Sequence, residues 1–234
     1  MRTILILIAC CISLQSTITG KAQNSQQRIG QALGIAFREQ NPSAMEQVEK
    51  ELTSDYWRSY CDYYKAIYLL KSGEKEKSRQ SIENGIKRLE KLKEKTSESY
   101  ALVSVLRTFS MQFVKNAMKQ GMIPEQVKDE AQKAITLDGQ NVRAYYALAS
   151  IDFYTPQEYG GGTNAEKLLL KAVTLEEQYG NAADLPTWGK DSSYQMLISL
   201  YLKNKDKVNA RKYWEEAIKQ YPEDRMIESL REKF

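Results

Sequence analysis

The sequence predicts an all-α protein: a right-handed α-solenoid of about five helix pairs that ends in a C-terminal capping helix. Three observations predict this fold. Apolar residues recur at helical spacing along the chain, the same order of small and large residues returns several times, and breaks that contain Gly, Pro or Asn separate the helical stretches. Helix pairs of this kind bury their apolar faces only against neighbouring pairs, so the pairs are expected to stack in a row.

The first 22 residues are expected to direct export and then to be removed. Arg2 precedes an apolar run that starts at Ile4, and Gly20-Lys21-Ala22 places small residues at the two positions that a signal peptidase reads. The run is too short, and too often interrupted by polar residues, for an uncleaved transmembrane helix. Cleavage after Ala22 would leave residues 23–234 as the folded domain, located in the periplasm or cell envelope.

The cysteines leave one alternative for this leader. Leu7-Ile8-Ala9-Cys10 is similar to a lipobox, and lipidation of Cys10 would attach the protein to a membrane; no other membrane contact is expected. Cys61 is the only cysteine within residues 23–234, so no intramolecular disulfide can form there. Because the chain has no histidine to activate it, Cys61 is expected to be a small buried hydrophobic residue.

The first helix pair is expected within residues 23–52. A weak apolar stripe runs from residue 23 to residue 40, and Asn41-Pro42 ends this helix because the residue before a proline disfavours helical geometry. Ser43 and Glu46 have the spacing of a capping box, which predicts a short second helix that continues to Leu52.

The second pair starts at Asp55 with a mainly aromatic stripe at helical spacing: Trp57, Tyr60, Cys61, Tyr64 and Tyr68. Gly73 ends this helix. The next helix carries a small, a large and a small residue on its packed face: Ser78, Ile82 and Gly85. Residues 86–97 are mostly charged, with Leu89 and Leu92 as large apolar residues, so this helix is expected to run past the body of the protein and to end in solvent near Thr96.

The third pair begins with an apolar face at helical spacing: Leu102, Val105, Leu106, Phe109 and Phe113. Gly121 is expected to end this helix. Pro124, which is followed by acidic residues, is expected to start the next helix, where a residue without an N–H and negative charges are both favourable. The second helix repeats the order of small and large residues and ends at Gly139: Val127, Ala131 and Ala134.

The fourth pair contains the main departure from the repeat. Its two helices are expected to pack through Tyr145, Leu148 and Ala149 and through Ala165, Leu169 and Ala172. The insertion between them, residues 154–162, ends in Gly160-Gly161-Gly162, and glycine amides before a helix could receive an anion. However, Thr163 and Glu166 have capping-box spacing and would already fill those amides, and the glycines equally suit a tight turn packed on a neighbouring backbone.

The fifth pair has the most regular spacing. Its first helix carries four apolar residues on one face: Tyr194, Leu197, Ile198 and Tyr201. After a polar break at residues 203–206, its second helix carries a small, a large and a small residue: Ala210, Trp214 and Ala217. Pro222 then ends this helix. A loop at residues 179–190, rich in Gly, Asn and Pro, precedes the pair, and residues 224–234 are expected to form the helix that caps the stack.

This order of residues resembles the tetratricopeptide repeat (TPR), a 34-residue helix pair. The resemblance covers residues 55–222 as about four pairs and residues 23–53 as a looser fifth. Pro156 and the Tyr159-Gly160-Gly161-Gly162 stretch resemble exported bacterial TPR proteins, including the T-component proteins of TRAP-type solute transporters. The resemblance implies a non-catalytic scaffold that docks a protein or peptide in a concave groove. The alternative is a solute-binding component of an envelope transporter.

Composition argues against several other functions. Lys and Arg (34) and Asp and Glu (30) are mixed along the chain, so no basic patch for nucleic acid is expected. The lack of histidine removes the commonest metal ligand and general base, and we expect neither metal nor cofactor. Two carboxylates could still act as in glycosidases, and Asp152 and Glu158 are close in sequence, but nothing selects them over the other acidic residues. The chain is therefore interpreted as a non-enzyme.

The resemblance also implies where a partner would dock. In such repeats a stripe of each first helix lines the concave groove. The expected stripe contains Arg143, Tyr146, Ser150, Phe153 and Tyr154 in the fourth pair, Tyr63 in the second pair, Gln195 and Lys203 in the fifth pair, and Tyr159 from the insertion. These aromatic and cationic side chains suit an extended acidic or aromatic segment. Phe153 and Tyr154 could instead pack the insertion against the body.

Overall fold

The structure, a computed structural model, describes residues 24–176 and 184–234, with only the backbone at residues 117–120. All regular elements within these ranges are α-helices or short 3-10 helices, and no strand occurs among them. None of these helices is long and apolar enough to span a bilayer. The predicted leader, residues 1–22, lies outside the described residues.

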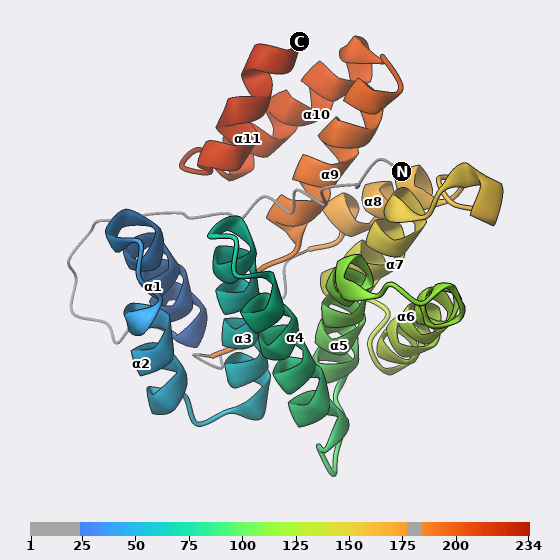
Figure 1. Cartoon of the computed structure of the whole chain (residues 1–234). Coiled ribbons are helices and arrows are strands. Elements are labelled where there is room, and N and C mark those ends of the chain that lie inside the picture. Colours follow the sequence, from blue (N-terminus) through green and yellow to red (C-terminus); the bar gives the residue numbers. More distant parts are fainter. Residues whose placement is uncertain (1–23, 177–183) are drawn as a thin grey trace.

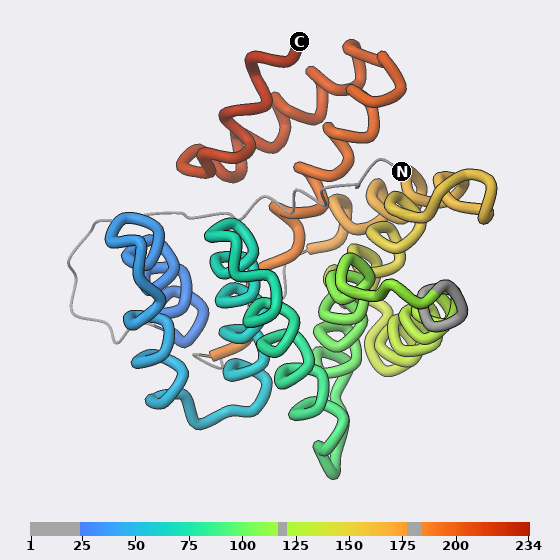
Figure 2. The backbone as a smooth tube through the Cα atoms, viewed as in Figure 1, coloured from blue at the N-terminus to red at the C-terminus, as the bar shows by residue number. Residues whose placement is uncertain are grey.

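Within the described residues the helices form five pairs: α1 (Ser25–Glu39) with α2 (Ser43–Glu51), α3 (Asp55–Lys71) with α4 (Lys75–Glu90), α5 (Ser97–Ser110) with α6 (Ala117–Leu137), α7 (Val142–Tyr154) with α8 (Ala165–Thr174), and α9 (Lys190–Lys203) with α10 (Lys207–Gln220). The short helix α11 (Arg225–Ser229) and the 3-10 helix η3 (Leu230–Lys233) pack on the last pair. Figures 1 and 2 show the first four pairs side by side from left to right, and the fifth pair with α11 at the top of the view. The predicted all-α solenoid of about five pairs with a C-terminal cap is confirmed.

The first helices of successive pairs form a continuous layer. Helix α1 packs on α3, α3 on α5, α5 on α7, and α7 on α9. Each of α4, α6 and α8 packs both on its own partner and on the first helix of the following pair. We call the surface formed by α1, α3, α5, α7 and α9 the first-helix face.

Small residues at the predicted positions let the helices of a pair approach closely. Ser78 in α4 is fully buried, and its hydroxyl donates to the Ala66 carbonyl of α3 at 2.7 Å. A Cβ added at Gly85 would lie 3.2 Å from Leu106 Cδ1 and 3.4 Å from the Ser59 carbonyl oxygen. A larger residue at Gly85 would therefore push α4 away from both α3 and α5, so the spacing found in the sequence is a packing requirement.

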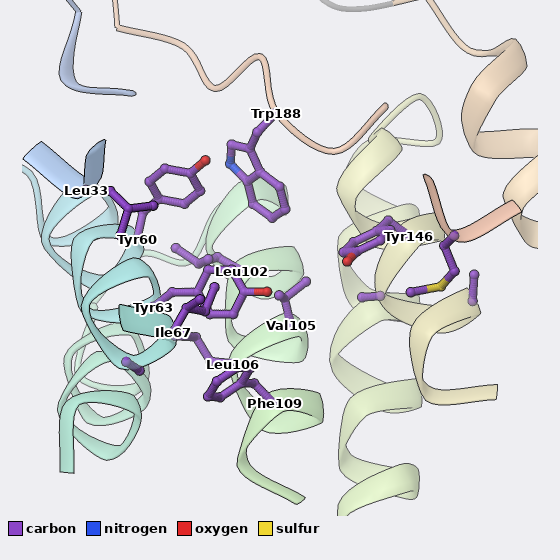
Figure 3. Close-up of a cluster of buried hydrophobic side chains, with 14 of the residues drawn as sticks. Leu33, Tyr60, Tyr63, Ile67, Leu102, Val105, Leu106, Phe109, Tyr146 and Trp188 are labelled. Atoms are coloured by element: carbon purple, nitrogen blue, oxygen red, sulfur yellow. The ribbon is translucent and has the colours of Figure 1, made fainter. Parts of the chain in front are cut away.

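Aromatic residues fill much of the core between the first helices (Figure 3). The rings of Tyr63 and Phe109, from α3 and α5, meet edge to face with centroids 5.5 Å apart. Among the tyrosines that were predicted to be core residues, Tyr60, Tyr194 and Tyr201 are buried, while Tyr64 and Tyr145 are only half-buried. The following three residues also confirm the predicted packed face of the last pair: Leu197, Ile198 and Ala210, all fully buried.

A buried ionic network joins the first two pairs. The Asp62 side chain of α3 is 1% exposed and pairs with Arg88 of α4 and, at 3.3 Å, with Lys65. Both cations also pair with Glu49 of α2. Burial raises the pKa of Asp62, against the lowering effect of Lys65 and Arg88. Because charge in the interior is tolerated only when it is paired, this network fixes how α2, α3 and α4 sit against one another.

Two predicted features of the N-terminal pairs are wrong. The Ser43–Glu46 capping box does not form, because α2 already includes Ser43 and the Asn41 side chain accepts the Ser43 N–H at 2.9 Å. Helix α4 ends at Glu90 and not near Thr96. Thr96 instead caps α5 by accepting the Ser99 N–H at 3.2 Å, so the charged stretch is a connection between two helices.

The third pair also differs from its prediction. Helix α5 ends at Ser110 and is followed by the 3-10 helix η1 (Met111–Phe113). Helix α6 begins at Ala117, which is before the predicted start at Pro124. Gly121 therefore lies inside α6 and ends no helix, and Pro124 also lies inside α6 instead of starting it. Glycine and proline mark breaks only where no neighbouring contacts hold the helix together, and here α5 and α7 pack along α6.

Candidate functional site

The last six residues of the connection between α8 and α9 return to the first-helix face. We call residues 184–189 the strap. It is a non-helical stretch that contacts α1, α3 and α7, close to where each of these helices begins. Three first helices from three different pairs thus share one bound segment, which makes this surface the candidate functional site.

The beginning of the strap is held through both its side chain and its backbone. The Ser25 N–H and hydroxyl donate to the Asp184 carboxylate at 2.9 and 3.0 Å. The Trp57 indole N–H donates to the Asp184 carbonyl at 3.1 Å. Further along, the Thr187 N–H donates to the side-chain carbonyl of Gln26 at 2.9 Å. The helix layer therefore binds the strap partly through its backbone atoms, which do not depend on the identity of the strap residues.

Trp188 is the anchor of the strap. Its side chain is 5% exposed, and its ring lies beside Tyr60, with centroids 5.3 Å apart (Figure 3). The indole N–H donates to the Tyr56 hydroxyl at 3.0 Å, and the Arg143 guanidinium lies over the indole at 6.0 Å. Arg143 also donates to the Trp188 carbonyl at 3.0 Å. The site thus satisfies both the polar atom of the indole and the adjacent backbone carbonyl.

Arg143 is oriented by an ion pair with Glu98. Its Nε and Nη2 donate to the two carboxylate oxygens, each at 2.6 Å, and the Glu98 carboxylate also accepts from Asn141 at 3.2 Å. Burial opposes the charge of Arg143, but the interaction with Glu98 leaves its pKa raised. Burial, and then the nearby Glu98 charge, raise the pKa of Tyr56 well above its usual value, so its hydroxyl stays protonated. Arg143 therefore stays charged and Tyr56 stays neutral beside Trp188, and hydrogen bonds hold both side chains in place.

Five of the residues expected on the docking stripe are buried: Arg143, Tyr146, Ser150, Tyr63 and Gln195. The Ser150 hydroxyl lies 3.7 Å from the Met196 sulfur, and the Gln195 amide donates to Asp224 at 3.1 Å. The sequence placed the core of α7 on a different stripe, through Tyr145 and Leu148. Both stripes are packed because α7 has α5 and α9 as neighbours on one side and α6 and α8 on the other. Whether this stripe binds a partner stays a prediction.

Three of the expected residues meet at the far end of the first-helix face. The Lys203 ammonium lies 5.1 Å from the Phe153 ring centroid, and the rings of Phe153 and Tyr154 meet edge to face at 5.0 Å. Phe153 and Tyr154 are half-buried and Lys203 is exposed. Burial raises the pKa of Tyr154 to about 12. Tyr159 is 78% exposed on the 3-10 helix η2 (Gln157–Tyr159) of the insertion.

The glycine loop of the insertion has a structural explanation. The Asp152 carboxylate accepts the N–H groups of Asn164 and Ala165 at 2.9 and 2.8 Å, so the start of α8 already holds an anionic group. The predicted capping box at Thr163 is wrong, because this carboxylate from α7 takes its place. A Cβ added at Gly161 would lie 1.9 Å from the carbonyl oxygen of Thr155, so only glycine fits there.

The Cys61 thiol and the Asp152 carboxylate both lie in structural surroundings. Cys61 is fully buried, and burial raises its pKa to about 12, which keeps the thiol protonated at neutral pH. Asp152 is engaged with two backbone amides. In the described ranges no three Cys, Asp or Glu side chains gather as metal ligands would.

Sequence reasoning missed the strap and two residues that hold it, Tyr56 and Glu98. A signal for the strap was present: Trp188 stands between Pro186 and Gly189 in a loop, outside any helical stripe. A large aromatic residue in such a loop has to pack somewhere else on the molecule. The sequence could not say on which helices.

Comparisons with known proteins support the architecture. No protein-family model matches the sequence, and the curated proteins give no significant match. A solved structure of a thermophilic TPR protein from Thermus thermophilus is similar, with a TM-score of 0.53 and 15% sequence identity. The match covers 88% of this chain and 95% of that chain. At this identity the similarity establishes the fold alone, which is a TPR-like helical repeat.

Proposed function

We propose that this protein is a non-catalytic scaffold that docks an extended segment of a partner protein along the first-helix face. The observation that supports this function most is the strap. It is a non-helical segment, held by one buried tryptophan and by hydrogen bonds to its own backbone. Recognition of extended peptides uses the same two elements, backbone hydrogen bonds for affinity and side-chain anchors for specificity.

The part of the first-helix face beyond the strap supplies the chemistry for the rest of a partner segment. Phe153 and Tyr154 are half-buried aromatics, and Lys203 adds a positive charge beside them. An aromatic side chain of a partner would stack on these rings, and an acidic side chain would pair with Lys203. We therefore propose a partner segment that is extended and carries acidic and aromatic residues.

A site-specific crosslink tests this function. A photo-reactive amino acid at Lys203 would be activated in cells of the native host, with the same substitution at Lys93 as a matched control. Lys93 is also an exposed lysine but lies in the connection between α4 and α5. We expect a protein adduct of defined mass at position 203, which is lost when Phe153 is changed to Ala, and none at position 93. Equal adducts at both positions, or none at 203, would contradict docking on this surface.

The solute-binding alternative predicts a different result. A small envelope solute would raise the melting temperature in a thermal-shift panel by mass action, without any protein adduct at Lys203. A saturable rise in melting temperature with a solute, together with no protein adduct at position 203, would favour that alternative.

We also propose that the protein is exported and that its chain starts at Gln23 after cleavage. The Gly20-Lys21-Ala22 stretch supports this proposal. Intact-mass measurement of the protein from its native host should give residues 23–234. A mass that starts at Cys10 with a diacylglycerol group would instead make it a membrane-anchored lipoprotein.

A further inference from the structure

We infer that the strap is a built-in competitor of the partner, and that the partner segment which replaces it carries a tryptophan followed by a glycine. This inference rests on the proposed function and specifies the partner at one end of the same face. It starts from the contacts of residues 184–189, which are those of a ligand bound to the helix layer.

Another chain could make many of the contacts that the strap makes to the helix layer. Its contacts come from α1, α3 and α7, and three hydrogen bonds engage strap backbone atoms: the Asp184 carbonyl, the Thr187 N–H and the Trp188 carbonyl. The Thr187 hydroxyl also donates to Gln26, at 3.3 Å. Any chain that follows the same path offers the same backbone groups. Leu185 lies between the contacts at Asp184 and Thr187 and is 39% exposed, so the helix layer does not select the residue at that position of the strap.

The Trp188 position is selective. The indole fills the space beside Tyr60 and donates its N–H to the Tyr56 hydroxyl, so phenylalanine would leave that hydroxyl without this bond. Arg143 over the ring favours the electron-rich indole over other aromatics. A partner would therefore place a tryptophan here.

The position after the tryptophan is also selective. Gly189 has φ +110°, where other residues are strained, and an added Cβ would lie 2.9 Å from Arg143 Cγ. Arg143 cannot move away without leaving Glu98, which holds it through two hydrogen bonds. The residue that follows the tryptophan of a partner is therefore glycine. An acidic residue four positions before the tryptophan would take the place of Asp184 at Ser25.

Competition follows from the covalent link. A tethered segment is present at an effective concentration of about millimolar, so a free segment with the same contacts binds only to the fraction of molecules whose strap is open. Loosening the strap should therefore raise the apparent affinity for a free tryptophan-glycine segment, without any new contact to that segment.

The test uses a fluorescein-labelled peptide with the sequence of residues 184–191 and the full chain as protein. Two variants loosen the strap: Trp188→Ala removes the anchor, and Gly189→Ala keeps the indole but collides with Arg143. Leu185→Ala, at the exposed strap position, is the matched control. Fluorescence anisotropy gives the affinity, and circular dichroism reports whether each variant keeps its helix content.

We expect Trp188→Ala and Gly189→Ala to bind the peptide about tenfold or more tightly than the wild type, and Leu185→Ala to bind like the wild type. A peptide with alanine in place of its tryptophan should bind none of them. Equal binding by all four proteins would overturn competition. Folded variants that do not bind the peptide would overturn the tryptophan-glycine site, while a specific crosslink at Lys203 would still leave the proposed function standing. If both variants lose their helix content, the strap is part of the core and the inference fails.

Discussion

Breaking the ion pair between Arg143 and Glu98 should be one of the most destabilising single changes in this protein. Arg143→Met keeps most of the side-chain volume and removes the charge. It eliminates two hydrogen bonds to Glu98 and the one to the Trp188 carbonyl. Removing one partner of a buried pair costs about 3–5 kcal/mol of unfolding free energy, because the other charge stays behind unpaired.

The expected loss lies at the lower end of that range. The Glu98 side chain is 20% exposed and keeps its contact with Asn141, so water and an amide partly replace the guanidinium. We therefore expect Arg143→Met to lose about 3 kcal/mol, or a melting temperature roughly 6–12 °C lower. Glu98→Gln should lose a similar amount, since Arg143 is only 5% exposed. The double variant should recover about 2 kcal/mol relative to the sum of the single losses.

Urea unfolding followed by circular dichroism measures all four corners of this cycle. Lys128→Met is the control, because the Lys128–Glu125 pair has a similar distance of 2.9 Å but is exposed; it should change stability by less than about 0.5 kcal/mol. A coupling energy near zero between Arg143 and Glu98, or a single-variant loss no larger than that of the control, would refute the reasoning. Because Arg143 and Tyr146 are both buried, replacing the two by alanine should also lower the melting temperature.

Three further predictions concern the packing that supports the site. Gly161→Ala should destabilise by more than about 2 kcal/mol, because its Cβ would enter the Thr155 carbonyl, whereas Gly30→Ala in the open middle of α1 should stabilise by about 0.5–1 kcal/mol; urea unfolding of both compares their signs. Asp152→Ala should cost about 1–2 kcal/mol by uncapping α8, and a loss within error of zero in the same assay would disprove that role. Cys61 should make stability fall at alkaline pH: its pKa is raised in the folded state from about 9 to about 12, so the unfolded thiol loses its proton first and stability drops as pH rises through this window, by up to about 1.4 kcal/mol per unit. The Cys61→Ala variant should show a shallower decline between pH 8 and pH 11, and an identical decline would contradict the assignment.

The stack of helix pairs was predictable because its determinants are local and periodic. Ser78, Gly85 and Ala210 are small residues at positions where two helices touch. Such positions recur along the chain at similar spacing, although the residues between them differ from pair to pair. The helix ends were less predictable. Asn41 and Asp152 cap their helices in place of Ser43 and Thr163, because a capping side chain needs only to reach the free amides and can come from outside the helix start.

The candidate site was predictable only in part. The sequence brought Phe153, Tyr154 and Lys203 to one surface, and the structure places them together. The sequence did not indicate that Arg143 is buried, because the residues that contact it, Trp188 and Glu98, are each 45 residues away in the chain. Contacts of that kind have no period and leave no trace in the spacing of a single sequence.

The central claim is that the first-helix face docks an extended segment of a partner protein. The most direct measurement is the affinity of the crosslinked partner segment, made as a peptide, for two charge-reversal variants by isothermal titration calorimetry. Lys203→Glu should weaken binding about tenfold or more, because it repels the acidic residue of the segment beside Phe153, while Lys93→Glu should bind like the wild type. Equal affinity of both variants and the wild type would contradict the claim.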